Sequence, residues 1–286
     1  MKIAFQTRKF DRYKNPISYR FSRWLLKRIY PVQPKHRSLQ IAVEYDKGLI
    51  NIDTCYAAER ELLFYGSVEP GISALIKKTV KQGDVCIDIG ANIGALTLLM
   101  AFQTGPEGRV IAVEPHPLML QRLQNNIRLN RLRHVNIIPA AVSDTEGRKT
   151  LYSKPGDHFH QGASSLQQSE KLTDRMEIQT ITGAVLEKKV GNEKCKFVKI
   201  DVEGHDYIVL KEIRNIVKES KPVIVFEYVK KPWSDTNSKI EDAITLLAEF
   251  NYHFYTMKYN LLFPLENGVN TDCDVVCMPE LIQAEI

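Results

Sequence analysis

The chain has 286 residues, of which 44% are hydrophobic and 26% charged, as in ordinary soluble globular proteins. No apolar stretch approaches the roughly 20 residues that a membrane-spanning helix needs, and the first residues lack the apolar core of a secretory signal. The five cysteines are odd in number and scattered, which argues against a disulfide framework. We therefore expect a cytoplasmic protein.

Residues 1–37 form a basic N-terminal arm. They hold eleven Lys or Arg residues and one acidic residue, a net charge of +10, whereas the rest of the chain carries −5. Apolar residues at near-helical spacing, interleaved with Arg and Lys, predict a basic amphipathic helix that ends at Pro31 and Pro34. We favour a helix docked on the domain. Peripheral contact with an anionic membrane, at its inner face, is the main alternative, and nucleic-acid contact is the least favoured.

Residues 38–286 are expected to form one domain that opens with a β-hairpin. Leu39–Tyr45 and Leu49–Asp53 alternate apolar and polar residues, and the segment between them contains a turn-forming Asp-Lys-Gly. The following segment, from Ala57 to Lys81, reads as helical or irregular pieces, because Gly66 and the Pro70-Gly71 pair interrupt it.

From Asp84 onward, apolar strands alternate with amphipathic helices, which predicts a mostly parallel sheet with helices on both faces. The predicted strands are Val85–Ile89, Val110–Val113, Val135–Ile138, Phe197–Ile200, Val223–Phe226, Tyr252–Met257 and Cys273–Met278. The predicted helices are Ala95–Phe102, Leu118–Leu129, Tyr207–Val217 and Ile240–Phe250. The last two strands are expected to form a hairpin at the sheet edge. The fold class is thus a doubly wound α/β fold on a seven-stranded sheet.

The strongest motif is the glycine turn that follows the strand Val85–Ile89. Gly90 and Gly94 allow the backbone to pass close to a ligand, and ligands of such sheets bind at the carboxyl ends of the strands. Asp88 is expected to accept hydrogen bonds there from an amino group of a cofactor. Asn92 stands where the dinucleotide fingerprint has its middle glycine, so a pyrophosphate would find less room.

Two further acids follow predicted strands. Glu114 lies about 20 residues beyond the glycine turn, at the place where an acid accepts hydrogen bonds from ribose hydroxyls. Asp144 follows the small residues Ala140 and Ala141, which would let a flat ring stack while the acid reads an adenine edge. These features favour a nucleoside ligand without deciding which one.

An ionisable cluster follows the strand Phe197–Ile200. It comprises Asp201, Glu203, His205 and Asp206, and part of it could simply cap the next helix. Glu227 follows the neighbouring strand, Val223–Phe226. Because the ends of parallel strands share one sheet edge, the two groups suggest a catalytic or metal-binding pair of carboxylates.

Together these motifs resemble the FkbM-type family of S-adenosylmethionine-dependent methyltransferases, over roughly Leu39 to Met278. The residues that carry the resemblance are Gly83-Asp84, Asp88 to Gly94, Glu114-Pro115, Ala141 to Asp144, Ser164 to Leu166, Lys199 to Gly204 and Phe226-Glu227. The resemblance implies a Rossmann-like methyltransferase sheet with its last strand antiparallel. It also implies methyl transfer mostly to hydroxyl oxygens of sugars, lipids such as glycolipids, or secondary metabolites. It does not extend to the arm.

For such a reaction we expect Asp201 to act as the base that takes the hydroxyl proton, with His205 as second choice. Glu203 and Glu227 would orient the acceptor or hold a divalent metal. The polar segment Gly156–Ser165 reads first as a solvated loop, although its His158 and His160 could bind a metal or assist the base. Any specificity for the acceptor would come from this loop and from the segment Lys230–Asp235, whose Trp233 could stack on a sugar.

Three other functions remain open from the sequence. A non-catalytic nucleoside-binding module on the same fold is the principal alternative. A nucleic-acid methyltransferase is unlikely and would need the basic arm to contact phosphates. A nicotinamide-dependent oxidoreductase is disfavoured by Asn92.

Overall fold

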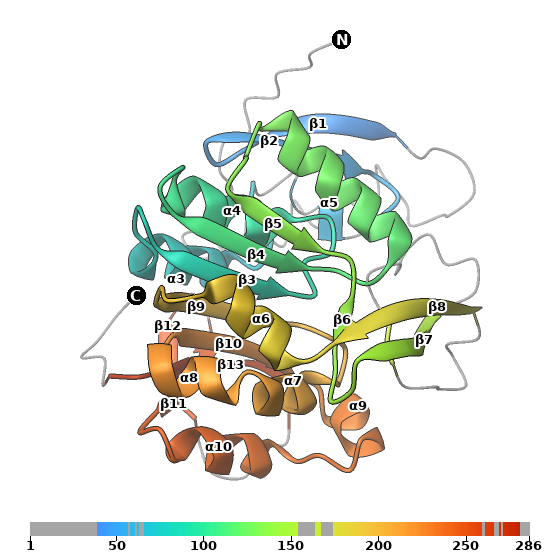
Figure 1. The fold of residues 1–286 in the computed structure, drawn as a ribbon. Coiled ribbons are helices and arrows are strands. Elements are labelled where there is room, and N and C mark those ends of the chain that lie inside the picture. The colour runs from blue at the N-terminus through green and yellow to red at the C-terminus, as the bar shows by residue number, and fades with distance from the viewer. Residues whose placement is uncertain are drawn as a thin grey trace, which may run out of the picture.

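The computed structural model describes residues 39–56, 58–60, 62, 66–153, 164–166, 174–258, 261–265, 269 and 271–280 (Figure 1). The predicted arm, residues 1–37, and the histidines of the predicted acceptor loop, His158 and His160, lie outside these residues. Among the helices that the structure describes, none combines the length and apolar character needed to span a bilayer. The roles expected of the arm and the loop therefore stay predictions.

The centre of the fold is an eight-stranded sheet (Figure 1). In spatial order its strands are β12 (Leu261–Pro264), β11 (His253–Lys258), β13 (Cys273–Met278), β10 (Val223–Tyr228), β9 (Cys195–Ile200), β3 (Val85–Ile89), β4 (Arg109–Val113) and β5 (Val135–Ile138). The five strands from β10 to β5 are parallel, and β13 is antiparallel to both its neighbours. The predicted doubly wound, mostly parallel sheet is confirmed. It has one strand more than expected, because β12 pairs with the outer side of β11.

Helices cover both faces of this sheet. On one face lie α3 (Pro70–Thr79), α4 (Ala95–Thr104) and α5 (Pro117–Leu129); on the other lie α6 (Gly183–Val190), α7 (Asp206–Glu212), α8 (Arg214–Ser220) and α10 (Ile240–Ala248). Successive strand residues such as Cys86 and Ile87 belong to the two separate cores, as the period of a strand requires. The single helix predicted over Tyr207–Val217 is two helices that meet at Ile213.

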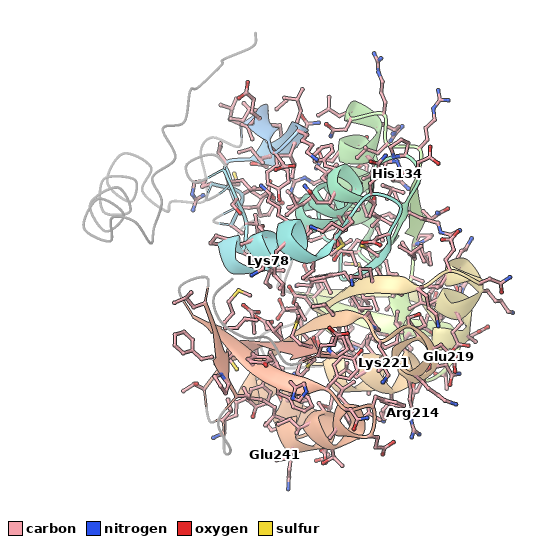
Figure 2. The ribbon with its side chains drawn as sticks, turned by 90° about the vertical axis from the view of Figure 1, so that its left-hand side faces the viewer. Lys78, His134, Arg214, Glu219, Lys221 and Glu241 are labelled. Carbon is pink, nitrogen blue, oxygen red and sulfur yellow. The ribbon has the colours of Figure 1, made fainter. Side chains whose placement is uncertain are left out.

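The outer sides of the helices are charged. Lys78 of α3, Arg214 and Glu219 of α8 and Glu241 of α10 are exposed and lie on the outer surface of the molecule (Figure 2). The buried sides of α3 and α10 carry Ile, Leu and Ala residues. This division is what the amphipathic pattern of the sequence predicted, and it leaves only the ends of the strands for polar chemistry.

Two smaller β-structures flank the main sheet. The predicted hairpin is confirmed as β1 (Gln40–Tyr45) and β2 (Gly48–Asp53), which pair antiparallel and lie against α5 (Figure 1). A three-stranded sheet of β6 (Ala141–Val142), β8 (Asp174–Ile181) and β7 (Gly147–Ser153) was not predicted. Its strand β6 follows β5 directly, so this second sheet stands beside the carboxyl edge of the first.

The expected role of Trp233 in stacking on a sugar is wrong. The segment Lys230–Asp235 forms helix α9, and the indole of Trp233 is completely buried. Its ring centroid lies 5.7 Å from that of Phe226, and its Nε1 donates a hydrogen bond of 3.1 Å to the carbonyl oxygen of Glu227. Trp233 therefore anchors α9 to β10 and forms part of the core, where sequence alone could not distinguish a buried aromatic side chain from an exposed one.

Replacing Trp233 with Ala should lower the free energy of unfolding by about 3–5 kcal/mol, because it empties a large buried volume. Urea denaturation followed by circular dichroism would measure the loss. The control is Lys231→Ala on the same helix, whose side chain is 82% exposed and whose removal should change stability by less than about 0.5 kcal/mol. Equal stability of the two variants would contradict the burial of Trp233.

Candidate active site

A cavity of about 430 Å³ lies at the carboxyl ends of β3, β4 and β9. Its walls come from several separate segments of the chain, among them the glycine turn after β3, the loop after β4, strand β6, the end of β9 with the residues that follow it, and the segment after the N-terminal hairpin. Seven of the ten predicted site residues line it: Asp88, Gly90, Asn92, Glu114, Asp201, Glu203 and His205. The structure thus brings together residues that are more than 100 positions apart in the sequence.

The glycine turn packs directly against the end of β9. Gly90 has a φ of +84°, and a Cβ atom there would lie 1.9 Å from the carbonyl oxygen of Asp201. No other residue type fits this position. Gly94 also has a positive φ, but it lies outside the cavity lining, where a Cβ atom would meet Leu123 of α5. Gly94 therefore allows close helix packing rather than lining the cavity.

Two buried carboxyl groups stand beside the turn. Asp88 accepts a hydrogen bond from the hydroxyl of Thr97, and burial raises its pKa. Glu114 accepts one hydrogen bond from the backbone N–H of Asn92 and one from that of His116, both 2.8 Å long. Burial raises the pKa of Glu114 to about 7. Each oxygen of Glu114 keeps a further lone pair, so the side chain can still accept hydrogen bonds from a ligand.

Asp144 lies away from the cavity. Its side chain is exposed and forms an ion pair of 2.8 Å with Lys149, which together with Ser143 lowers its pKa to about 2. The small residues before it, Ala140 and Ala141, do line the cavity, as expected for a site that accepts a flat ring. The position of Asp144 does not support the prediction that its carboxylate contacts the edge of an adenine ring.

The predicted base, Asp201, is held by a buried cation that the sequence analysis missed. Lys199 is 4% exposed, and its Nζ lies 2.7 Å from Oδ2 of Asp201 and 3.9 Å from Oε2 of Glu69. Burial opposes the charge on Lys199, but the carboxylates of Asp201 and Glu69 outweigh it and raise its pKa. The sequence did contain a signal for this pair. Lys199 lies on a central strand two residues before Asp201, and residues two apart in an extended chain point to the same side.

The remaining predicted catalytic residues differ in their access to the cavity. Glu203 and His205 line it, and the Nε2 of His205 lies 3.4 Å from the hydroxyl of Ser143. Burial, helped by Lys149, lowers the pKa of His205 to about 4, so its imidazole is neutral at pH 7. Glu227 does not line the cavity, and burial together with the charges of Asp201 and Glu203 raises its pKa to about 9.

Within the described part of the chain, no three His, Cys, Asp or Glu side chains are grouped so that they could hold a metal ion. Of the predicted acceptor loop, the described residue Ser164 lines the cavity, as does Leu166 just beyond it. The hydroxyl of Ser165, between them, donates a hydrogen bond of 3.1 Å to the carbonyl oxygen of Glu203. The described end of the loop is therefore joined to the ionisable cluster.

A family model described as the methyltransferase FkbM domain matches residues 88–254. The chain belongs to this methyltransferase family. The match begins at Asp88 and ends in β11, so it contains the glycine turn, Glu114 and the cluster after β9, and it confirms the resemblance noted from these motifs. The FkbM match does not include the N-terminal hairpin or the segment between it and β3.

Two curated relatives align with parts of the chain. It is 29% identical over 157 residues to the hexuronic acid methyltransferase AglP of Haloferax volcanii. This alignment covers 55% of this chain and 61% of AglP. It is 28% identical over 95 residues to a protein-L-isoaspartate O-methyltransferase of Caenorhabditis elegans. This alignment covers 33% of this chain and 42% of that protein. The chain therefore spans less than two thirds of either relative.

Solved methyltransferase structures are similar at lower identity. A methyltransferase FkbM from Methylobacillus flagellatus is 16% identical with a TM-score of 0.44, and the similarity covers 76% of this chain and 52% of that one. A structure named as a putative rRNA-methylase from Clostridium thermocellum is 13% identical with a TM-score of 0.46, covering 74% and 94%.

Replacing Lys199 with Met should lower the free energy of unfolding by about 3 kcal/mol at pH 8, because the neighbouring carboxylates keep their charge without a partner. As the pH falls to 5, Glu69 and Asp88, whose pKa values burial raises, take up protons and the difference from the wild type should shrink. Urea denaturation at both pH values would measure it. Lys196→Met, an exposed site on the same strand, is the control, and a loss that does not depend on pH would contradict the charge argument.

Proposed function

We propose that this protein is an S-adenosylmethionine-dependent methyltransferase that methylates an oxygen atom of a sugar-containing acceptor. The observation that carries the proposal is the position of Glu114, which reaches the cavity beside the glycine turn with both carboxylate oxygens fixed by backbone N–H groups. Glu114 follows β4, the neighbour of the strand that leads into the glycine turn. A carboxylate held at this place in a nucleotide-binding sheet can accept hydrogen bonds from the two hydroxyls of a ribose.

The residues of the cavity fit this cofactor at both ends. Glu114, Ala140 and Ala141 form an end that suits a nucleoside, with an acceptor for ribose and small side chains beside a flat ring. Lys199 of β9 lies on the other side of β3 from Glu114, with Asp88 of β3 between them, and these charged groups suit the ammonium and carboxylate of an amino acid. Asn92 occupies the turn in a left-handed conformation with a φ of +52°, where a dinucleotide site needs glycine.

When bound, the cofactor supplies a methyl group activated by a positive sulfonium. The chain must then hold the acceptor oxygen in line and remove its proton. Asp201 is the first candidate for this base, because its side chain is 30% exposed at the cavity and Lys199 fixes the direction of its carboxylate. His205 is neutral but more deeply buried, which makes it the second candidate. Glu203 and Ser164 lie where they can orient the acceptor.

The acceptor class rests on the relatives. One is named as acting on hexuronic acids and the other as an O-methyltransferase. The polar lining of the cavity, with Glu203, His205 and Ser164, suits a hydroxylated acceptor through hydrogen bonds. We therefore propose uronic acids and their glycosides as the first acceptors to examine, with tritiated methyl donor to detect transfer.

Calorimetric titration of the full chain with S-adenosylmethionine and, in parallel, with NADH tests the cofactor. We expect binding of S-adenosylmethionine alone. The variant Glu114→Gln should weaken that binding by about 10-fold or more, because it removes a charged acceptor of two ribose hydroxyls. Binding of NADH instead would contradict the proposal. Binding of S-adenosylmethionine without methyl transfer to any acceptor would favour a non-catalytic binding module.

The base is tested with Asp201→Asn. Methyl transfer to an accepted uronic acid should fall by about 100-fold or more, whereas binding of S-adenosylhomocysteine should stay within about twofold of the wild type, since the amide keeps the shape of the side chain. The exposed Glu193→Gln provides a control for substitution of an acid. Loss of cofactor binding by Asp201→Asn would instead assign Asp201 to the cofactor site.

A further inference from the structure

Helix α5 carries a row of polar side chains that faces the N-terminal hairpin. Arg122, Asn126 and Asn130 are four residues apart and so share one side of the helix. Asn130 accepts a hydrogen bond of 2.8 Å from the backbone N–H of Leu49 and donates one of 2.6 Å to its carbonyl. These bonds pair β2 with a side chain as if with a neighbouring strand.

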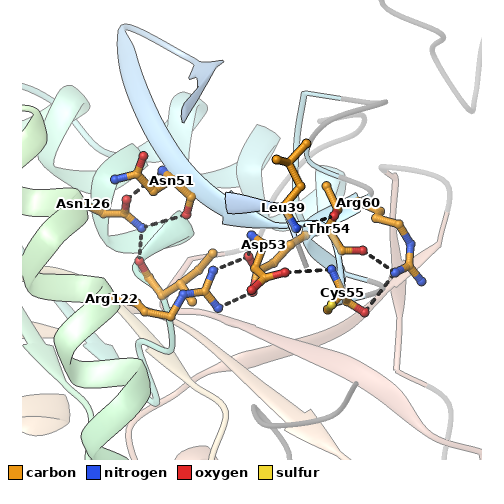
Figure 3. A network of polar contacts seen from close by, with 10 residues as sticks. Leu39, Asn51, Asp53, Thr54, Cys55, Arg60, Arg122 and Asn126 are labelled. Carbon is orange, nitrogen blue, oxygen red and sulfur yellow. Dashed lines mark hydrogen bonds and ion pairs between the residues drawn. The ribbon is translucent and has the colours of Figure 1, made fainter. Parts of the chain in front are cut away.

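Asn126 connects the hairpin to the glycine turn. It is completely buried, its Oδ1 accepts a hydrogen bond of 2.8 Å from the N–H of Asn51, and its Nδ2 donates one of 2.8 Å to the carbonyl of Ile93 (Figure 3). One amide thus joins β2 to the loop that lines the cavity. A shift of the hairpin relative to this loop would leave buried polar atoms without partners, which is costly.

Arg122 holds the segment that follows the hairpin. Its guanidinium forms two hydrogen bonds with the carboxylate of Glu59, whose Oε2 also accepts one of 2.6 Å from the N–H of Asp53. The side chains of Arg122 and Glu59 are only 13% and 8% exposed, and Figure 3 shows Arg122 directed toward the region of Asp53. Arg122 also lies over the ring of Tyr56, 5.1 Å from its centroid. The pairing is therefore bidentate and shielded from water.

The segment held in this way forms a wall of the cavity. Tyr56, Glu59 and Leu62 line it, and Arg122 lies on the same helix as Met119, which lines it too. Just before that helix come Glu114 and His116, at the end that we assign to the nucleoside. The whole segment precedes residue 88, where the match to the FkbM family begins.

We propose that the Glu59–Arg122 ion pair latches the N-terminal extension, the described residues within 39–62, over the nucleoside end of the cofactor site and so sets how tightly the nucleoside binds. This inference rests on the proposed function. Arg122 is a positioning residue, since it acts through Glu59 and Tyr56. The extension is then a part of the binding site and not only an addition to the fold.

The test is calorimetric titration of full-length Arg122→Met with S-adenosylhomocysteine and with 5′-methylthioadenosine, which lacks the amino-acid part. Both dissociation constants should rise by a similar factor of about 10 or more, because the wall is no longer pre-organised. The control is Arg128→Met, an exposed arginine of the same helix, which should leave both within about twofold. A lower melting temperature with unchanged dissociation constants would reduce the latch to a structural role and overturn the proposal.

A second variant, Tyr56→Ala, removes part of the wall while keeping the ion pair, and serves if Arg122→Met does not fold. It should weaken both ligands alike. If only S-adenosylhomocysteine is weakened, the extension acts at the amino-acid end and the proposal is wrong. If the wild type binds neither ligand, the proposed cofactor itself fails, whereas normal wild-type binding that neither variant changes overturns the latch alone.

Discussion

The close approach of the glycine turn to the end of β9 is the constraint on which the site depends. The N–H of Asp201 donates to the carbonyl of Ile89, and the N–H of Gly90 donates to that of Val113, so the turn is tied to the strands on both sides. Only a residue without a Cβ atom fits at position 90. This contact sets Asp88, Glu114 and Asp201 around one cavity, and any widening of the turn would separate them.

The second determinant is electrostatic. Asp88, Glu69 and Asp201 are carboxylic acids near one another, and the buried ammonium of Lys199 lies among them. Burial of Glu69 and Asp88 raises their pKa values, and the cation on Lys199 opposes that shift. An end of the cavity that contains both signs of charge can receive a zwitterionic group, while the end near Glu114 and the small residues of β6 suits a flat, hydroxylated ligand. The charged groups around Lys199 and the small residues near Glu114 thus lie on opposite sides of β3.

Helix α5 links this cavity to the N-terminal extension. Its apolar residues Met119, Leu123 and Ile127 belong to the core under the sheet, whereas its row of Arg122, Asn126 and Asn130 binds the extension. The same helix therefore contacts both the core and the extension. The extension lies outside the family match, which begins at Asp88.

Much of the fold followed from local patterns. Alternating apolar strands and amphipathic helices predicted the parallel sheet, and the ends of β3 and β13 were placed to the residue. Seven of the ten predicted site residues line the cavity, because parallel strands bring their carboxyl ends to one edge. The small sheet of β6, β7 and β8 was missed, since β6 has two residues and its pairing with β8 crosses more than thirty positions.

What the sequence by itself determined was the class of fold, the edge of the sheet at which the cavity lies and most of the acids that stand there. Only the tertiary structure decided which side chains reach the cavity. Trp233 is buried, Asp144 is exposed outside the cavity, Lys199 lies near Glu69 as well as Asp201, and Arg122 pairs with Glu59. The reason is that residue type and spacing fix local conformation, whereas the partner of a charged or aromatic side chain depends on segments that meet only after folding.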